Sequence, residues 1–435
     1  MALRVAGVVL ALAATASADR LSPVDLARKN DGGYVTGLPL VSYSTDLGFG
    51  GGARAYYYWN GHRDDARFAN TPYLFRVFLQ AYATTGGLQF HWLDLDAPRF
   101  DSSPYRIRSQ LIFARNTNSN YFGHGARSLD PLRFPGSAAF DSYADYAAAQ
   151  HQIMGGETFA KYDQYDLLEP NGIAIIERGF DNDRVRVLAG LGFSYARIHD
   201  YTGKTVDATS GQATEAQTRL TTDCAAQLLV GCSGGRDDHL RVGVSYDTRD
   251  FEPDPNRGVF LDAVLDVGTA ALGSEYDYVR FLVAARGYYS PIPDRTDLVL
   301  ATRAAFEWQS SGTPFFSMDT IPFTEDPRQG LGGHRTLRGY RQDRFVGPVM
   351  ALVNQEARWT FARTTLWRQK LAFIAVGFLD VGRPFDRVSE LSLRRWRPSY
   401  GGAMRISWNL ATVITVDYGV SPEDSGLYIN FNHIF

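Results

Sequence analysis

Hydrophobic and polar residues alternate along much of this chain. The segment Tyr278–Tyr289 reads YVRFLVAARGYY, and its odd-numbered positions, such as Phe281 and Val283, are apolar or small. Both arginines of the segment, Arg280 and Arg286, occupy even-numbered positions. Because successive side chains of a β-strand point to opposite faces, this pattern predicts a strand with one apolar and one polar face.

The same alternation recurs in segments 184–195, 239–248, 259–267 and 412–420. These predicted strands are about ten residues long or longer, whereas strands of soluble proteins are commonly ~5–6 residues and a tilted membrane-crossing strand needs ~9–11. Small and charged residues inside with apolar and aromatic residues outside are typical of a transmembrane β-barrel. A soluble sandwich is the alternative, but it leaves the strand length and the aromatic run Tyr56–Trp59 unexplained.

We count about sixteen predicted strands, and two segments, 161–168 and 172–180, compete for the sixth. The predicted strands start near Tyr34, Gly48, Tyr73, Gly87, Tyr105, Tyr165, Arg184, Leu240, Gly258, Tyr278, Leu298, Val349, Leu371, Tyr400, Thr412 and Leu427.

The predicted connections fall into two classes that alternate along the chain. The long ones are 116–158, 199–238 and 310–347, and the short ones are near Pro170, Ser290 and Trp408. A barrel with both termini in the periplasm needs an even number of strands, long outer loops and short inner turns. The sequence therefore predicts an all-β protein, a transmembrane antiparallel β-barrel of about sixteen strands.

The first eighteen residues have the features of an export signal. Arg4 precedes the apolar stretch Val5–Ala14, and Ala16 to Ala18 fit a small-x-small cleavage pattern. The stretch is well short of the ~20 apolar residues that a membrane helix needs. We therefore expect a signal peptide at residues 1–18, a short segment at 19–33 and the barrel at 34–435.

Charge content bears on the partner of the protein, and cysteine content bears on its disulfide bonds. The chain has 44 basic and 47 acidic residues and a net charge of −3, which argues against nucleic acid as the main partner. Its two cysteines, Cys224 and Cys232, are close in sequence, and an exported protein favours a disulfide between them. Two unpaired thiols are the alternative.

The segment Gly330–Gly347, GLGGHRTLRGYRQDRFVG, is rich in glycine and arginine, but it does not fit a phosphate-binding loop. No lysine followed by serine or threonine comes after its glycines. The eight histidines are scattered, which argues against a metal site. A G-x-S-x-G motif is absent from the sequence. We therefore expect no cofactor, no metal and no enzymatic activity, and an outer-membrane lipase remains a minor alternative.

The chain ends in GLYINFNHIF, another alternating segment. Leu427, Ile429, Phe431, His433 and Phe435 are predicted to share the outer face. The last strand of a barrel must be presented to insertion machinery, and a terminal aromatic residue suits such a signal. A chance terminal phenylalanine is the alternative.

Four motifs follow one another in the second half of the chain: Tyr246–Ala263, then Leu337–Tyr340, Asn354–Trp359 and Phe378–Phe385. With the aromatic C-terminus, this series resembles the bacterial surface antigen superfamily, which includes BamA/TamA-type outer-membrane assembly factors and two-partner secretion transporters. Such proteins carry periplasmic POTRA domains before the barrel, whereas about fifteen residues precede the first predicted strand here. The resemblance implies an integral outer-membrane barrel.

The resemblance also assigns a role to the arginine-rich segment. In the superfamily, the long loop after the eleventh strand folds into the barrel, and its Arg-Gly-aromatic tip meets acidic residues of the inner wall. The matching tip residues here are Arg338, Gly339 and Tyr340, and the matching wall residues are Glu356 and Asp380. Two inward carboxylates suit one guanidinium, which offers five donors in a planar fork. An ordinary surface arginine is the alternative for Arg338.

Three functions remain open at this stage. The first is insertion or transport of proteins or lipids at the outer membrane through a weak seam between the first and last strands. The second is a passive pore, since ~16 strands can enclose an aqueous channel. The third is the lipase-type enzyme. Expected partners are outer-membrane lipid and lipopolysaccharide, and client outer-membrane proteins or a separate periplasmic protein.

Overall fold

The computed structural model describes residues 29–435 except 66–67, 69–70, 72, 99, 101–102, 251, 253, 293–295, 325–327, 367–368, 409–411 and 432. The predicted signal peptide, 1–18, and residues 19–28 of the short N-terminal segment lie outside the described residues.

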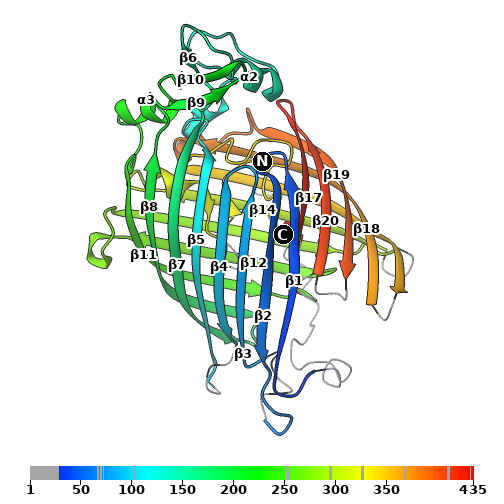
Figure 1. The fold of residues 1–435 in the computed structure, drawn as a ribbon. Coiled ribbons are helices and arrows are strands. Elements are labelled where there is room, and N and C mark those ends of the chain that lie inside the picture. The colour runs from blue at the N-terminus through cyan, green and yellow to red at the C-terminus, as the bar shows by residue number, and fades with distance from the viewer. Residues whose placement is uncertain are drawn as a thin grey trace.

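Sixteen strands form one closed barrel, in which successive strands are antiparallel neighbours (Figure 1). The predicted fold class is thereby confirmed. The barrel strands are β1 Gly33–Ser44, β2 Gly48–Trp59, β3 Phe75–Thr84, β4 Leu88–Ala97, β5 Tyr105–Asn120, β7 Gln164–Phe180, β8 Val185–His199, β11 Gly234–Asp247, β12 Gly258–Gly268, β13 Tyr278–Tyr289, β14 Leu298–Gln309, β17 Val349–Leu366, β18 Gln369–Phe385, β19 Arg397–Trp408, β20 Thr412–Val420 and β21 Ser425–Phe431.

Short elements outside the barrel wall gather in the longer connections. They are η3 Gly125–Leu129, α2 Tyr143–Gln150, β6 Glu157–Thr158, β9 Thr205–Ala208, β10 Gly211–Glu215, α3 Arg219–Ala225, η4 Ala270–Leu272, α4 Phe315–Met318, β15 Thr320–Ile321, β16 Arg328–Gln329 and η5 Val388–Glu390. Within the described ranges, none of these helices is long and apolar enough to cross a bilayer.

The sixth strand differs from the prediction. β7 runs continuously from Gln164 and so joins the later part of the first candidate segment to the whole of the second; Pro170 lies within it, opposite Phe113 of β5. The short turn predicted near Pro170 is therefore wrong. Proline lacks a backbone N–H, and the ladder between β7 and β8 is interrupted between Leu168 and Asn171, while pairing with β5 continues through the proline.

The three longest connections lie at one end of the barrel. We call the connections at this loop end L1 (45–47), L3 (121–163), L4 (200–233), L6 (310–348), L7 (386–396) and L8 (421–424). Elements of L3 and L4 form a small cap, because β6, β10 and β9 make one three-stranded sheet (Figure 1). Three outer connections, L1, L8 and 85–87, are short, so the predicted alternation of long and short connections does not hold throughout.

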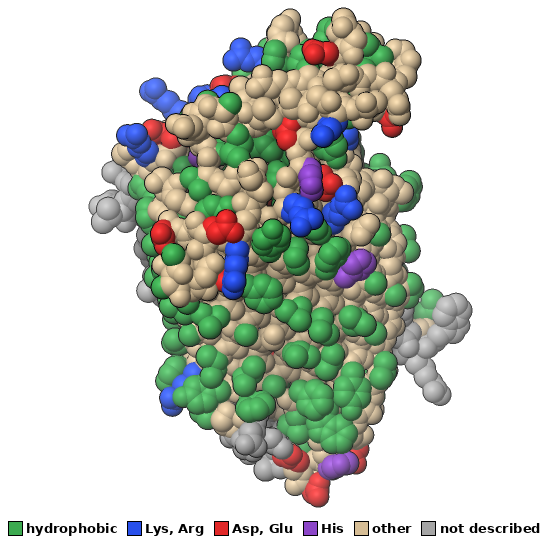
Figure 2. Space-filling view, turned by 60° about the vertical axis from the view of Figure 1, so that its left-hand side comes forward, with side chains coloured by type: hydrophobic (Ala, Val, Ile, Leu, Met, Phe, Trp, Pro, Cys, Tyr) green, Lys and Arg blue, Asp and Glu red, His purple; other side chains and the backbone are tan. Residues whose placement is uncertain are grey.

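The two faces of the wall have different chemistry, as the alternation predicted. Outward residues such as Val35, Phe49 and Leu191 are more than half exposed, while inward residues such as Arg280 and Asp266 are buried. Figure 2 shows hydrophobic side chains over the wall between the loop end and the lower tip, with charged side chains gathered mainly near the two ends. This distribution suits a wall that faces lipid.

The C-terminus departs from the predicted face. Leu427, Ile429 and Phe431 pair with outward residues of β20, but β21 ends at Phe431. His433 and Phe435 are buried, and Phe435 packs with Tyr288 and Val299 on the inner faces of β13 and β14. The prediction that His433 and Phe435 lie outside is therefore wrong, because inward contacts with distant strands hold the chain end inside the barrel.

Candidate functional site

Arg338, at the tip of L6, meets two carboxylates of the inner wall. Its Nε and Nη2 donate to the two Asp380 oxygens over 2.8 and 2.9 Å, and Nη1 donates to Glu356 Oε1 over 2.8 Å. All three side chains have no exposed surface. The Arg338 guanidinium also lies 3.4 Å from the centre of the Phe378 ring. We call Arg338, Glu356 and Asp380 the latch; its geometry joins L6 to β17 and β18.

Further arginines surround the latch carboxylates. Arg405 of β19 donates to both Glu356 oxygens over 2.7 and 2.9 Å, and Arg358 Nε donates to Glu356 Oε2 over 2.8 Å. Asn354 Nδ2 donates to Asp380 Oδ1 over 2.7 Å. Sequence reasoning missed Arg358, Arg405 and Asn354. Their positions could have been found, since Asn354, Glu356 and Arg358 share the inward parity of β17.

The next two tip residues explain why a glycine and an aromatic residue follow Arg338. Gly339 has a φ of +94°, and an added Cβ would lie 2.8 Å from the backbone of Gly419 and Val420 in β20. A side chain there would therefore separate L6 from the wall. Tyr340 is 1% exposed and donates from its hydroxyl to the Pro398 carbonyl over 3.2 Å. It belongs to an apolar cluster between L6 and the inner wall.

The barrel closes through a very short contact between its first and last strands. In the described residues, β1 and β21 pair at two positions, Tyr43 with Ile429 and Ser44 with Tyr428. By contrast, β1 pairs with β2 over its whole length. The segment 33–42 therefore has no partner strand on its β21 side among the described residues. We call the contact between β1 and β21 the seam.

Arg341 connects the two strand turns at the loop end of the seam. Its Nη1 donates to the Thr45 carbonyl of L1 over 2.7 Å and lies 3.6 Å from Asp46 Oδ1. Its Nε lies 2.8 Å from Asp424 Oδ2 of L8. Burial, opposed by the charge of Arg341, raises the pKa of Asp46 to about 6. Because L1 ends β1 and L8 begins β21, we call this contact the Arg341 bridge.

The chain end is held inside the barrel by residues next to the latch. Arg358 Nη2 donates to the Phe435 carbonyl over 2.9 Å, and Arg303 Nη1 donates to the Ile434 carbonyl over 3.1 Å. His433 contacts Arg405 through Nδ1 at 2.6 Å and Asp254 through Nε2 at 2.9 Å. Arg358 and Arg405, which contact Glu356, therefore also hold the tail, 433–435, inside the barrel.

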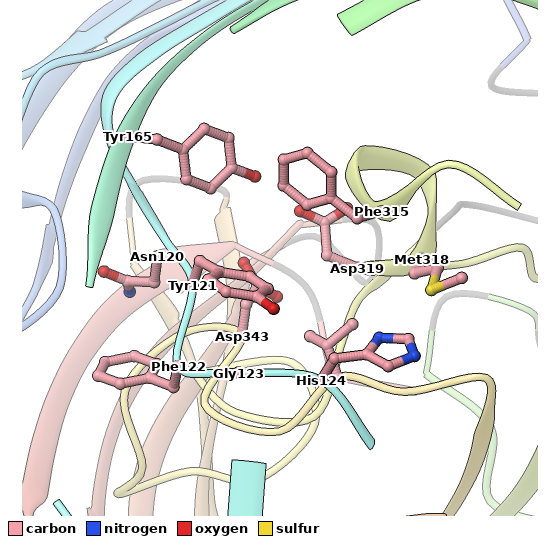
Figure 3. A pocket seen from close by; sticks show the side chains of 11 residues that line it. Asn120, Tyr121, Phe122, Gly123, His124, Tyr165, Phe315, Met318, Asp319 and Asp343 are labelled. Carbon is pink, nitrogen blue, oxygen red and sulfur yellow. The ribbon is translucent and has the colours of Figure 1, made fainter. Parts of the chain in front are cut away.

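A small cavity lies between L3 and L6, and Figure 3 shows Asp319 and Asp343 among the side chains that line it. Burial raises the pKa of Asp319 to about 6, and burial together with the Asp319 charge raises the pKa of Asp343 well above its usual value. In the described part of the chain, no three His, Cys, Asp or Glu side chains are grouped so that they could hold a metal ion.

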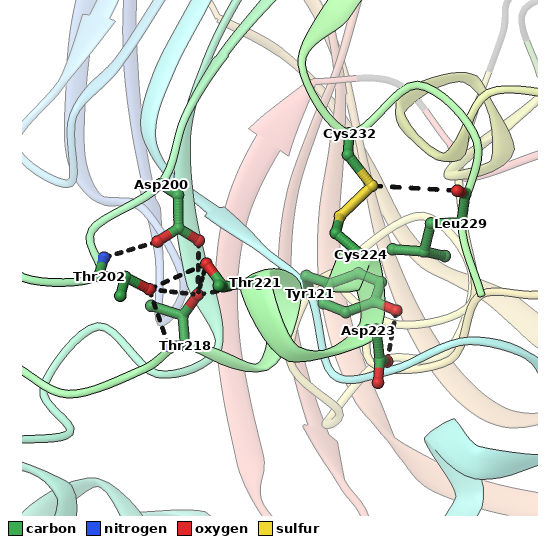
Figure 4. The surroundings of a disulfide bond; sticks show 9 residues. All are labelled: Tyr121, Asp200, Thr202, Thr218, Thr221, Asp223, Cys224, Leu229 and Cys232. Atoms are coloured by element: carbon green, nitrogen blue, oxygen red, sulfur yellow. Dashed lines mark hydrogen bonds between the residues drawn. A yellow bond between two sulfur atoms is a disulfide. The ribbon is translucent and has the colours of Figure 1, made fainter. Parts of the chain in front are cut away.

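Cys224 of α3 and Cys232 form a disulfide within L4 (Figure 4). Beside it, Asp223 accepts hydrogen bonds from the Tyr121 hydroxyl over 2.8 Å and from Arg127 Nη2 over 2.9 Å. Thr218 caps α3 by accepting from the Thr221 backbone. These contacts join L4 to L3, so the two loops form one cap over the loop end.

Comparison with known proteins gives two family matches. The Omp85 superfamily domain matches residues 129–432, and a domain of unknown function, DUF5982, matches residues 14–74. No curated protein matches the chain.

Two solved structures have a similar fold. The BamA of Haemophilus ducreyi lacking POTRA domains 1–3 aligns with a TM-score of 0.55 and 12% identity, over 93% of this chain and 70% of that one. CdiB from Escherichia coli aligns with a TM-score of 0.52 and 12% identity, over 92% of this chain. This chain spans 62% of the CdiB chain, which is less than two thirds of its length.

Proposed function

The chain belongs to the Omp85 superfamily and is an integral protein of the bacterial outer membrane, and from this premise we propose that its seam opens to insert or transport protein or lipid. The short β1–β21 contact is the observation that carries the proposal. Among the described residues, two pairs close a wall whose other junctions pair along most of their length. The loop end is the extracellular end, because long loops of such barrels face outward.

The unpaired segment of β1 is the proposed docking edge. A free strand edge presents backbone N–H and C=O groups that can pair with an incoming strand. Outward residues of this segment, Val35 and Val41, are 72% and 68% exposed, which suits contact with lipid or an apolar client surface. Pro39 lies in the same segment and lacks a donor, so pairing through that position is weakened. The proposal assigns no catalytic role to any residue.

The latch favours this function over a passive pore. A buried arginine with two buried carboxylates holds L6 against the inner wall, and the apolar cluster beneath L6 occupies space that an open channel would leave to water. We therefore propose that the lumen conducts poorly while L6 remains in place. A POTRA-bearing partner in the periplasm would deliver clients, if delivery is required.

A crosslink at the seam tests the proposal. Tyr43→Cys/Ile429→Cys would join the strands at one of their two pairs, in a background in which Cys224 and Cys232 are alanine. The matched control is Ala53→Cys/Ala81→Cys, which joins the paired strands β2 and β3. The readout is the rate at which a small denatured outer-membrane barrel folds into vesicles that contain the protein.

We expect the protein to accelerate client folding, the oxidised seam variant to lose the acceleration, and reductant to restore it, while the control crosslink changes nothing. Equal acceleration by the crosslinked and reduced seam variants would contradict the proposal. A steady, large conductance in planar bilayers without any acceleration would instead favour the passive pore.

A further inference from the structure

L7 folds back over the outward face of the barrel wall. Val349 and Phe385 face each other across β17 and β18 at outward positions, yet neither has exposed surface. Trp396, at the end of L7, packs on this pair together with Phe306 and Trp308 of β14. Other outward residues of the same strands, such as Leu379, are about half exposed. L7 therefore lies against the wall at its extracellular rim, where the aromatic belt of a barrel meets lipid headgroups.

This part of the rim has an excess of positive charge. Residues 383–397 contain the acids Asp386 and Glu390, and five arginines at 383, 387, 394, 395 and 397. Arg395 and Arg397 donate to the Leu129 carbonyl of L3 and so point toward the cap. Asp386 accepts from the Ala126 backbone.

Two of the arginines, Arg387 and Arg394, remain available on the outer side, and Arg383 lies beneath them. Arg387 and Arg394 are exposed, and their side chains make no hydrogen bond or ion pair in the part of the chain that the structure describes. Arg383 occupies an outward position of β18 and is 8% exposed beneath L7. It donates to Ser392 Oγ over 2.8 Å and to the Arg394 carbonyl, while its Nε has no partner.

Apolar side chains accompany these charges. Leu393 is 93% exposed, and Leu391 and Val388 are 45% exposed. Isolated exposed leucines are ordinary, but here they lie next to arginines on a loop that rests on a lipid-facing wall. Arginine beside apolar and aromatic residues is the composition of segments that lie at a membrane surface.

We propose that L7, through Arg387 and Arg394, binds the phosphate groups of a phosphorylated glycolipid in the outer leaflet, the lipid A part of lipopolysaccharide. The guanidinium fork matches phosphate oxygens in a bidentate manner. Leu391 and Leu393 enter the boundary between headgroups and acyl chains. The inference rests on the location of the barrel in the outer membrane and not on what passes through the seam.

The opposite end of the wall supplies a matched control. Arg178 of β7 is exposed on the outward face at the periplasmic side, and its guanidinium lies 5.6 Å from the Tyr105 ring and 5.0 Å from the Phe180 ring. It is an outward arginine within an aromatic belt, but it faces the inner leaflet, where lipopolysaccharide is absent. Arg178→Gln removes the same charge without touching L7.

The test measures binding of fluorescent diphosphorylated lipid A to the full-length protein in phosphatidylcholine nanodiscs. We expect saturable binding by the wild type and by Arg178→Gln, and an affinity at least about tenfold lower for Arg387→Gln/Arg394→Gln. Both substituted side chains are exposed and make no hydrogen bond or ion pair in the described structure, so folding should persist, and heat-dependent gel mobility checks it. Leu393→Gln, which changes no charge, should also weaken binding.

Two competitors identify the ligand. Dephosphorylated lipid A and phosphatidylglycerol should compete poorly, because the first lacks the phosphates and the second lacks the glycolipid. Unchanged affinity in the double variant would overturn the proposal. Equal competition by dephosphorylated lipid A would do so as well, and equal competition by phosphatidylglycerol would replace lipopolysaccharide by a general anionic lipid.

Discussion

The junction between β17 and β18 and the junction between β1 and β21 close the same barrel in very different ways. β17 and β18 pair from Val349 to Leu366, and their inner faces supply both latch carboxylates. β1 and β21 pair at two positions, and contacts made by L6 hold their turns together. The first junction depends on the backbone ladder, whereas the second depends on side chains, so the proposed opening would break few backbone hydrogen bonds among the described residues.

The Arg338→Ala variant should have the largest effect on the stability of the barrel, because it leaves Glu356 and Asp380 buried with one partner fewer. Breaking a buried ion pair in this way costs roughly 3–5 kcal/mol. We expect a lower melting temperature in heat-dependent gel mobility, and a higher conductance in planar bilayers as L6 leaves the wall. Arg387→Ala, which removes an exposed arginine of L7 without a hydrogen bond or ion pair in the described residues, serves as the control. Equal, steady conductance of wild type and Arg338→Ala would show that L6 is not held by the latch.

Release of the tail should strengthen the seam. Phe435→Ala removes the ring from its contacts with Tyr288 and Val299, at a cost of roughly 3 kcal/mol in packing. Continuing the β1–β21 register would place Ile434 opposite Leu38. We expect faster disulfide formation between cysteines at these two positions when Phe435 is alanine.

Phe431→Ala, on the outward face of β21, is the matched control for this tail variant and should not accelerate the crosslink. If Phe435→Ala also leaves the crosslinking rate unchanged, the tail does not compete with closure of the seam.

Loss of the Arg341 bridge should loosen the extracellular end of the seam by a smaller amount. Arg341→Ala removes one hydrogen bond to L1 and an ion pair to L8, which together contribute roughly 1–3 kcal/mol. Hydrogen exchange of the Leu427 backbone amide, which donates to Thr45 Oγ1 over 3.0 Å, should accelerate. Arg341→Lys keeps the charge and should restore part of the protection. Protection equal to wild type in Arg341→Ala would exclude the bridge as a support of the seam.

The smallest expected effect concerns pH. The pKa of Asp46 is raised by burial to about 6, so the folded protein takes up a proton there before the unfolded chain does. The charged Asp46 carboxylate therefore destabilises the folded state above pH ~6. This destabilisation declines as the pH falls toward about 4, the pKa of an aspartate in the unfolded chain. Asp46→Asn should therefore raise the melting temperature at pH 8 by a few degrees and change it little at pH 4. An equal shift at both pH values would contradict this assignment.

The alternation of apolar and polar residues along each strand was the basis of most of the predictions about the fold. Arg280 and Arg286 had inward parity, and Asp380 stood between two apolar neighbours, so their faces followed from the period of two alone. The Arg338-Gly339-Tyr340 tip and its two wall carboxylates were placed by resemblance, and the structure brings these residues together. The turn predicted at Pro170 does not form, because paired strands lie on both sides of the residue and hold it in an extended conformation.

The sequence by itself determined the strands, their faces and the family, because each depends on neighbouring residues or on an ordered series of motifs. The tertiary structure decided the direction of the tail, the Arg341 bridge and the position of L7. Phe435 is held by Arg358, Arg341 meets Thr45 and Asp424, and Trp396 covers Val349 and Phe385. The tail and the Arg341 bridge depend on partners that are far away in sequence, and L7 depends on a wall built from several strands. The local alternation of residues therefore does not encode these contacts. They form when the barrel closes and brings the groups within contact distance.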